Sequence, residues 1–196
     1  MKTQKKLAVA GILLHQEITS LGNFGRRVMN QPNKTVVIAG GAKVSDKITA
    51  LKQFVHTGVK AIFIGGKMVN TFLLAQKAKS KIKSFSISDI PSTLLSSKEE
   101  NNQNLVSEIS LAGEILDFAS EKEVRFIFPD DYKCVDEFKA PTYFVESEPD
   151  FDKVLQLDLG PKTIENFRNT ILSDGIENVF WNGPLGAYDH PTNYEY

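Results

Sequence analysis

The sequence predicts an α/β fold, namely a three-layer, Rossmann-like parallel sheet with helices on both faces. Three short apolar runs, at residues 35–39, 61–64 and 178–181, each lead into a glycine-containing turn. Amphipathic helical patterns lie between these runs. Such alternation is typical of parallel strands joined by right-handed crossovers. The last of these turns lies close to residue 196, so we expect the sheet to be truncated at its C-terminal end.

Composition and charge exclude several classes of protein. The chain has 196 residues, a length typical of one domain, and a formal net charge of −1. This balance argues against binding to nucleic acid or to a membrane surface by bulk electrostatics, and we expect neither partner. Cys134 is the single cysteine, which excludes an internal disulfide and fits a reducing compartment. No run of about 18 apolar residues is present, so we expect a soluble, cytoplasmic protein.

The first 80 residues alternate between helical and extended patterns. In order, they predict a helix over 14–28, a strand over 35–39, a helix over 48–57, a strand over 61–64 and a helix over 68–76. The strand at 35–39 is apolar after Thr35, which predicts burial on both of its faces. Ser45 is a suitable N-cap for the second helix, and Gly58 is a typical residue to end it.

The second half is less regular. Residues 77–104 are rich in Lys, Ser and Asn, and we interpret them as a surface excursion around a weak edge strand at 82–87. The predictions that follow are a helix over 105–119, a strand over 124–128, an irregular segment over 130–150, a strand over 154–157, a helix from Pro161 that buries Ile164, Phe167 and Ile171, and a strand over 178–181.

The acidic residues of the irregular segment allow two interpretations. They are Asp130, Asp131, Asp136 and Glu137. They suggest either a cation site or a solvated loop, and we expect the loop. We expect Cys134 beside them to be inert, because no base lies near it in the sequence.

Lys43 and Lys47 flank a predicted helix start just after Gly40 and Gly41. A helix N-terminus carries partial positive charge and disfavours each cation by about 0.3–1 kcal/mol. The pair therefore suggests a bound anion, because freed N–H groups and two ammonium groups would hold phosphate oxygens. The alternative is that both lysines are solvated and Asp46 balances the dipole. The stretch matches neither the dinucleotide fingerprint nor the Walker loop.

Two further glycine turns follow predicted strands. Gly65 and Gly66 follow the strand at 61–64, where they either leave room for a flat ring or simply make a tight turn. Asn182 stands just beyond the last strand, at the carboxyl end where open α/β sheets bind ligands. The alternative for this segment is a capped turn with Trp181 in the core.

Taken together, these motifs resemble phosphoglycerate kinase. The motifs that match this family in order and spacing are GGAKVSDKI at 40–48, IGGKM at 64–68, LDLGPKTI at 157–164 and WNGPLG at 181–186. Residues 10–14 also resemble the start of that family's interdomain helix. On this resemblance we expect residues 1–30 to form an interdomain-type helix and residues 31–196 a partial nucleotide-binding domain.

The resemblance implies phosphoryl transfer in glycolysis between 1,3-bisphosphoglycerate and ADP, with magnesium, to give 3-phosphoglycerate and ATP. It implies that Lys43 is catalytic and contacts the transferring phosphoryl group, and that Lys47 contacts the α-phosphate. The other positions that it implies are Gly41, Gly65, Gly66, Leu157 and Pro184 around the adenosine, Asn182 at the phosphates and Asp189 at the ribose hydroxyls. Such chemistry needs charge neutralisation and alignment more than covalent help.

The sequence departs from the family at two of these positions. Lys67 replaces a third glycine at the adenine pocket, and Asp189 is one methylene shorter than the family's glutamate; we expect both to weaken nucleotide binding.

The resemblance also places several functional groups outside this chain. The sugar-phosphate site and a catalytic arginine would lie in an N-terminal lobe, and the magnesium-binding aspartate would follow the last motif, so no metal ligand is expected here. We therefore expect a phosphoglycerate kinase fragment that supplies part of the ATP/ADP site, is inactive alone and meets phosphoglycerate only through that lobe. The alternative is a non-catalytic relative that binds nucleotide or a partner. We also expect self-association through an open sheet edge.

Overall fold

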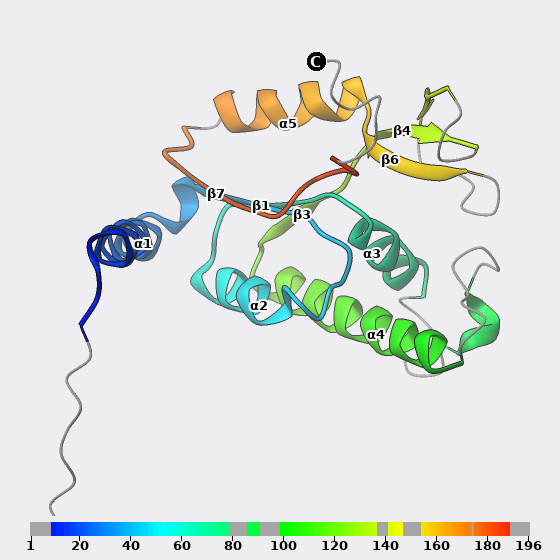
Figure 1. The fold of residues 1–196 in the computed structure, drawn as a ribbon, viewed down its shortest axis with the longest axis horizontal. Helices are drawn as coiled ribbons and strands as arrows, with labels where there is room; N and C mark the ends of the chain where they lie inside the picture. Colours follow the sequence, from blue (N-terminus) through cyan, green and yellow to red (C-terminus); the bar gives the residue numbers. More distant parts are fainter. Residues whose placement is uncertain are drawn as a thin grey trace, which may run out of the picture.

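The computed structural model describes residues 9–78, 86–90, 99–136, 141–146, 154–173 and 175–188. Its centre is a parallel sheet in the order β3-β2-β1-β7, formed by β1 (Thr35–Ala39), β2 (Ala61–Ile64), β3 (Arg125–Ile127) and β7 (Asn178–Asn182) (Figure 1). Ala39 at the end of β1 is in register with Ile64 on one side and Asn182 on the other. The carboxyl ends of β2, β1 and β7 therefore meet along one rim, as the sequence predicts.

Helices cover both faces of this sheet and complete the three layers. The helices on one face are α2 (Ile48–Thr57), α3 (Met68–Lys77) and α4 (Glu99–Glu121), and α5 (Pro161–Ser173) lies on the other (Figure 1). Val37 of β1 belongs to the larger core beneath the three helices, whereas its neighbour Val36 belongs to the core under α5. Both valines are buried, which confirms that β1 is covered on both faces. Under α5 the rings of Phe63 and Phe167 lie 4.5 Å apart.

Helix α1 (Ile12–Asn30) docks only by its C-terminal part. Phe24 packs against Phe180 of β7 with ring centroids 5.4 Å apart, and Val28 is buried. The apolar face of this helix continues toward its N-terminus, where the side chains are exposed, namely Leu14, Ile18 and Leu21. In Figure 1 this helix lies beside β7, at the edge of the body. No helix in the described ranges is long and apolar enough to cross a membrane.

A second, antiparallel sheet corrects the prediction of an irregular segment over 130–150. Its order is β5-β4-β6, with β4 (Asp131–Val135), β5 (Tyr143–Glu146) and β6 (Leu155–Leu159). The strand predicted over 154–157 therefore pairs here and not in the parallel sheet. The extended pattern is not evident in the sequence, because β4 buries two charged residues, Asp131 and Lys133, among its apolar ones.

Several predicted boundaries also need correction. Helix α2 has Lys47 and not Ser45 as its N-cap, and no side chain caps it; it ends at Gly58 in the left-handed conformation as predicted. Helix α4 begins at Glu99, before the predicted start. Residues 79–85 lie outside the described residues, and Ile87, assigned to an edge strand, begins the 3-10 helix η3 (Ile87–Asp89). Ile164 is 55% exposed and not buried.

Asp131 is buried and closes the N-terminus of α5, so the expected solvated loop is wrong at this residue. Its carboxylate accepts hydrogen bonds from the Thr163 backbone N–H at 2.7 Å, the Thr163 hydroxyl at 2.6 Å and the Lys162 N–H at 3.0 Å. Thr163 Oγ1 also accepts the backbone N–H of Asp131 at 3.0 Å. An acid on a strand thus supplies the cap that α5 lacks in its own sequence.

Candidate functional site

Three loops meet at the carboxyl rim of the parallel sheet, one after each of β1, β2 and β7. Their backbones are joined by hydrogen bonds from Gly40 N to Asn182 O at 3.0 Å, from Gly66 N to Leu185 O at 2.7 Å and from Met68 N to Gly41 O at 3.0 Å. Three motifs that are far apart in the sequence therefore form one structural unit.

Glycines permit this close packing of loop on loop. A Cβ on Gly40 would overlap the carbonyl of Pro184, and a Cβ on Gly66 would lie 2.7 Å from Gly41 O. A Cβ on Gly65 would overlap the side chain of Leu185. The space over Gly65 is therefore filled by Leu185, so in this structure Gly65 makes a tight turn and leaves no open slot for a flat ring.

Gly41 differs from the other glycines of the rim. Its φ is +137°, a conformation that residues with a Cβ rarely adopt, and a Cβ there would meet only Lys47 Cε, at 3.7 Å. The backbone of Gly41 thus lies open beside the stem of Lys47. This is the geometry in which a chain can approach a ligand closely.

Lys47 and Asn182 connect the first and last motifs directly. Lys47 is half-buried, and its Nζ donates a hydrogen bond of 2.6 Å to Asn182 Oδ1. Lys43, in the same turn, is exposed and has no hydrogen-bond or ion-pair partner within the described part of the chain. The alternative that both lysines are solvated, with Asp46 balancing the helix dipole, fits the exposed Lys43 but not Lys47, which is held by Asn182. Asp46 is exposed and makes no ion pair with either lysine. The rim therefore carries two positive charges without a paired acid.

The remaining predicted residues lie close to this unit or outside the described structure. Leu157 is buried in β6, and its carbonyl accepts the N–H of Ala187 at 2.7 Å, which ties the second sheet to the loop after β7. Pro184 lies exposed in that loop. Asp189 lies outside the described residues.

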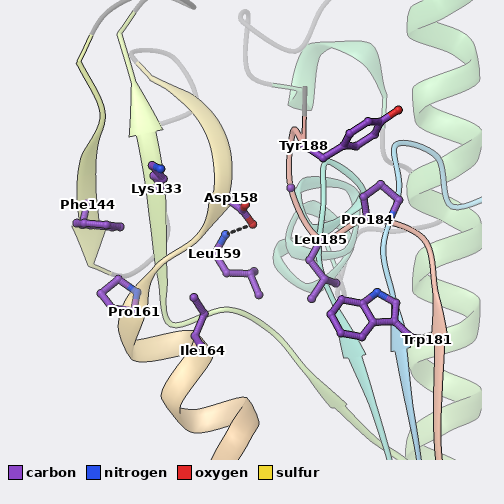
Figure 2. Close-up of a pocket in the computed structure, with 11 residues that line it drawn as sticks. Lys133, Phe144, Asp158, Leu159, Pro161, Ile164, Trp181, Pro184, Leu185 and Tyr188 are labelled. Atoms are coloured by element: carbon purple, nitrogen blue, oxygen red, sulfur yellow. Dashed lines mark hydrogen bonds between the residues drawn. The ribbon is translucent and has the colours of Figure 1, made fainter. Parts of the chain in front are cut away.

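A cavity of about 440 Å³ opens between α5, the second sheet and residues 181–188 (Figure 2). It is lined by Lys133, Phe144, Asp158, Leu159, Pro161, Ile164, Trp181, Pro184, Leu185, Gly186 and Tyr188. Of the predicted site residues that the structure describes, only Pro184 contributes to it. Trp181 is 63% exposed here, so the alternative that placed it in the core is wrong. Figure 2 shows its ring facing the cavity from the β7 side, opposite Phe144.

Two charged residues of this cavity were not identified from the sequence. Lys133 of β4 and Asp158 of β6 are in register across the antiparallel pair. Burial raises the pKa of Asp158, while the hydrogen bond from Leu159 N, at 2.8 Å, and the positive charge of Lys133 oppose the rise. The sequence does carry a signal for this pair, because Lys133 and Asp158 each stand between two apolar residues.

The donor set of the rim fits a polyphosphate better than a bare metal ion. Two ammonium groups, an amide and an open glycine backbone gather at strand ends, where anions bind readily. Within the described ranges, no three His, Cys, Asp or Glu side chains come together as a metal site.

Comparison with known proteins agrees with the resemblance. A family model described as phosphoglycerate kinase matches residues 1–194. The phosphoglycerate kinase of Dictyoglomus turgidum is 36% identical over 193 residues, which cover 94% of this chain and 41% of the relative. That of Lactobacillus gasseri is 38% identical over 197 residues, which cover 100% of this chain and 42% of the relative. The chain thus spans about two fifths of the length of the curated relatives it matches.

Solved structures give the same result. Phosphoglycerate kinase from Coxiella burnetii aligns with a TM-score of 0.66 and 25% identity, over 95% of this chain and 42% of that chain. The enzyme from Pyrococcus horikoshii aligns with a TM-score of 0.64 at 24% identity, over 93% and 41% of the two chains, and supports the fold alone. The four-stranded parallel sheet, the interlocked glycine loops and the family match over nearly the whole sequence agree, and the chain belongs to the phosphoglycerate kinase family.

Proposed function

We propose that this chain binds the phosphates of ADP and ATP at the rim formed by Lys43, Lys47 and Asn182, as its part of the phosphoglycerate kinase reaction. The observation that carries the proposal is the 2.6 Å hydrogen bond between Lys47 Nζ and Asn182 Oδ1. It brings residues 135 positions apart to one point at the end of the parallel strands. Neither side chain is acidic, so the positive charge of Lys47 remains available to an anion.

Each of the three side chains has a distinct role in this proposal. Lys47 binds the α-phosphate from its half-buried position. Asn182 accepts from Lys47 through Oδ1, which leaves its amide NH₂ to donate to a phosphate oxygen. Lys43, exposed and without a partner among the described residues, reaches the transferring phosphoryl group and stabilises its charge. Magnesium bound to the nucleotide would supply further neutralisation of the phosphates.

The adenosine would lie toward Gly41, Gly65 and Gly66, beside Leu157 and Pro184, with Asp189 at the ribose. Because Leu185 fills the space over Gly65, entry of the base there requires the loop after β7 to shift. The phosphoglycerate substrate would bind in an N-terminal lobe outside this chain, which would supply the groups that hold it. The function supported best is thus the nucleotide half of a two-lobed phosphotransferase.

Isothermal titration calorimetry with MgADP and MgATP tests this proposal. Lys47→Ala is expected to weaken affinity at least tenfold, because a hydrogen bond to a charged group contributes about 1.5–3 kcal/mol. Lys52→Ala is the matched control. Lys52 lies within α2, whereas Lys47 is its N-cap, and Lys52 pairs with Glu114 at 3.5 Å, so its loss should leave affinity unchanged. Absence of binding by the unmodified chain, or equal affinities for it and Lys47→Ala, contradicts the proposal.

One observation favours a second candidate, a non-catalytic relative that binds a partner through the open side of the sheet. Val179 and Trp181 of the edge strand β7 are both exposed and apolar. Exposed apolar residues on a strand whose outer edge has no partner among the described residues favour protein contacts. The two candidates differ in their response to nucleotide, which only the first requires.

A further inference from the structure

The turn between β1 and α2 carries both lysines of the proposed phosphate site, and it is anchored at several points. At its start, Gly41 O accepts the N–H of Met68 at 3.0 Å. In its middle, the side chain of Val44 is fully buried, and Val44 O accepts the N–H of Lys47 at 2.9 Å. No side chain of the turn itself caps α2.

Glu108 of α4 supplies a further anchor from a distant part of the chain. Its Oε2 accepts the backbone N–H of Ser45 at 2.8 Å, across 63 positions of sequence. The backbone that carries this carboxylate is well fixed, because its neighbour Ile109 and, farther along α4, Ala112 are fully buried in the main core. Ser45 lies between Lys43 and Lys47 in the sequence, so this hydrogen bond restrains the backbone that sets the positions of both lysines.

The Glu108 carboxylate accepts a backbone hydrogen bond and does not pair with the lysines of the turn. Glu108 makes no ion pair with Lys43 or Lys47 among the residues that the structure describes. Its one contact therefore orders the turn without neutralising the charge that a phosphate needs. An acceptor on this amide also suits a turn that leads into the positive end of a helix.

We propose that Glu108 is a positioning residue that holds Lys43 and Lys47 in place for nucleotide phosphates; the inference rests on the proposed function. It acts through the Ser45 amide and not on the nucleotide. An acceptor oxygen is what the role requires, and a negative charge is not. Glu108→Gln should therefore preserve the role and Glu108→Ala should abolish it. If the carboxylate only repelled anions, both variants would bind more tightly.

The test combines MgADP calorimetry with hydrogen exchange at the Ser45 amide in the unmodified chain, Glu108→Ala, Glu108→Gln and Glu114→Ala. In Glu108→Ala we expect exchange at Ser45 to accelerate about tenfold or more and affinity for MgADP to fall about tenfold. In Glu108→Gln both should remain within about threefold of the unmodified chain. Glu114→Ala is the control on the same helix, because it removes only the 3.5 Å pair with Lys52.

Exchange at the Ile62 amide in the central strand β2 separates a local effect from general unfolding. Protection retained at Ile62 and lost at Ser45 supports the inference. Unchanged or tighter MgADP binding by Glu108→Ala, or a glutamine variant as weak as the alanine variant, overturns it. If the unmodified chain binds MgADP and Lys47→Ala does not, while Glu108→Ala binds normally, the proposed function stands and only this inference fails. If the unmodified chain binds no MgADP, the proposed function and the positioning role of Glu108 are both wrong.

Discussion

Asp131 on β4 and Thr163 in the first turn of α5 form a buried pair in which one carboxylate oxygen accepts both the backbone N–H and the hydroxyl of the threonine. Asp131→Ala should lower the free energy of unfolding by about 3 kcal/mol, because it leaves buried donors of Thr163 and Lys162 without their acceptor. Thr163→Val should also be destabilising, because it removes the hydroxyl that donates to Asp131 and accepts the backbone N–H groups of Asp130 and Asp131. Urea denaturation of both variants and of the double variant measures the coupling. Strictly additive losses would show that the two side chains act independently.

Gly40 should tolerate no side chain. Gly40→Ala places a Cβ against the carbonyl of Pro184, so the loops after β1 and β7 must separate. We expect a loss of stability and, if the rim binds nucleotide, of MgADP affinity. Gly25→Ala is the contrasting control, because Gly25 lies within α1 and a Cβ there meets nothing within 4 Å. That variant should be more stable by about 0.5–1 kcal/mol, as alanine favours the helix. Equal effects of the two substitutions on thermal unfolding would contradict this account.

Asp158 should make stability fall as pH rises. Burial raises its pKa above the ordinary 3.8, so the folded chain holds this proton more tightly than the unfolded chain does. Through the window that begins near 3.8 and ends at the raised value, the folded state binds more protons, and the free energy of unfolding decreases with rising pH. Asp158→Asn keeps an acceptor for Leu159 N and removes the titration. The stability of the unmodified chain minus that of Asp158→Asn should therefore decline between acid and neutral pH. A constant difference would contradict the prediction.

The edge of β7 should support self-association. Val179 is 44% exposed on this uncharged strand, and no other strand pairs with its outer edge among the described residues. Val179→Lys should shift the chain toward monomer, because a charged residue blunts edge pairing. Leu172→Lys is the control, since it makes the same kind of change at an exposed position of α5. Light scattering after size exclusion at several concentrations reports the outcome. A concentration-independent monomer for the unmodified chain would refute the expectation.

Catalytic turnover by this chain alone is expected to be absent. The chain spans 41% of the Dictyoglomus turgidum enzyme, and the phosphoglycerate-binding groups are expected outside it. A coupled assay with ATP and 3-phosphoglycerate should therefore remain at the buffer rate, with that enzyme as the positive control. Turnover that disappears in Lys43→Ala would show that the chain carries a complete active site.

The centre of the parallel sheet was predictable because β1 and β2 are apolar runs that are each followed by two glycines. β1 and β2 consist of nothing but apolar residues and Thr35, so burial on both faces left a clear signal. The second sheet was not predictable in the same way. Asp131 and Lys133 break its apolar pattern, and the contacts that justify them, with Thr163 and Asp158, depend on the tertiary fold.

The candidate site was predictable in part for a similar reason. Lys43 and Lys47 are conspicuous because a helix start disfavours cations, and Asn182 follows a strand. The role of Glu108 left no local signal, because an acid on an amphipathic helix is ordinary. Only the packing of α4 against the turn gives it a partner.

The order in which this molecule can assemble follows from the position of β7. β1 pairs with β2, the next strand in sequence, and with β7, which follows all the other strands of the sheet. As the ribosome releases the chain, the lysines of the first turn are present long before the amide that Lys47 contacts. The last strand must then be added alongside the first, a closure over a long stretch of chain that is entropically costly and slow. The rim is thus expected to form late in folding. A chain interrupted before residue 182 carries Lys43 and Lys47 but lacks the Asn182 amide that Lys47 contacts.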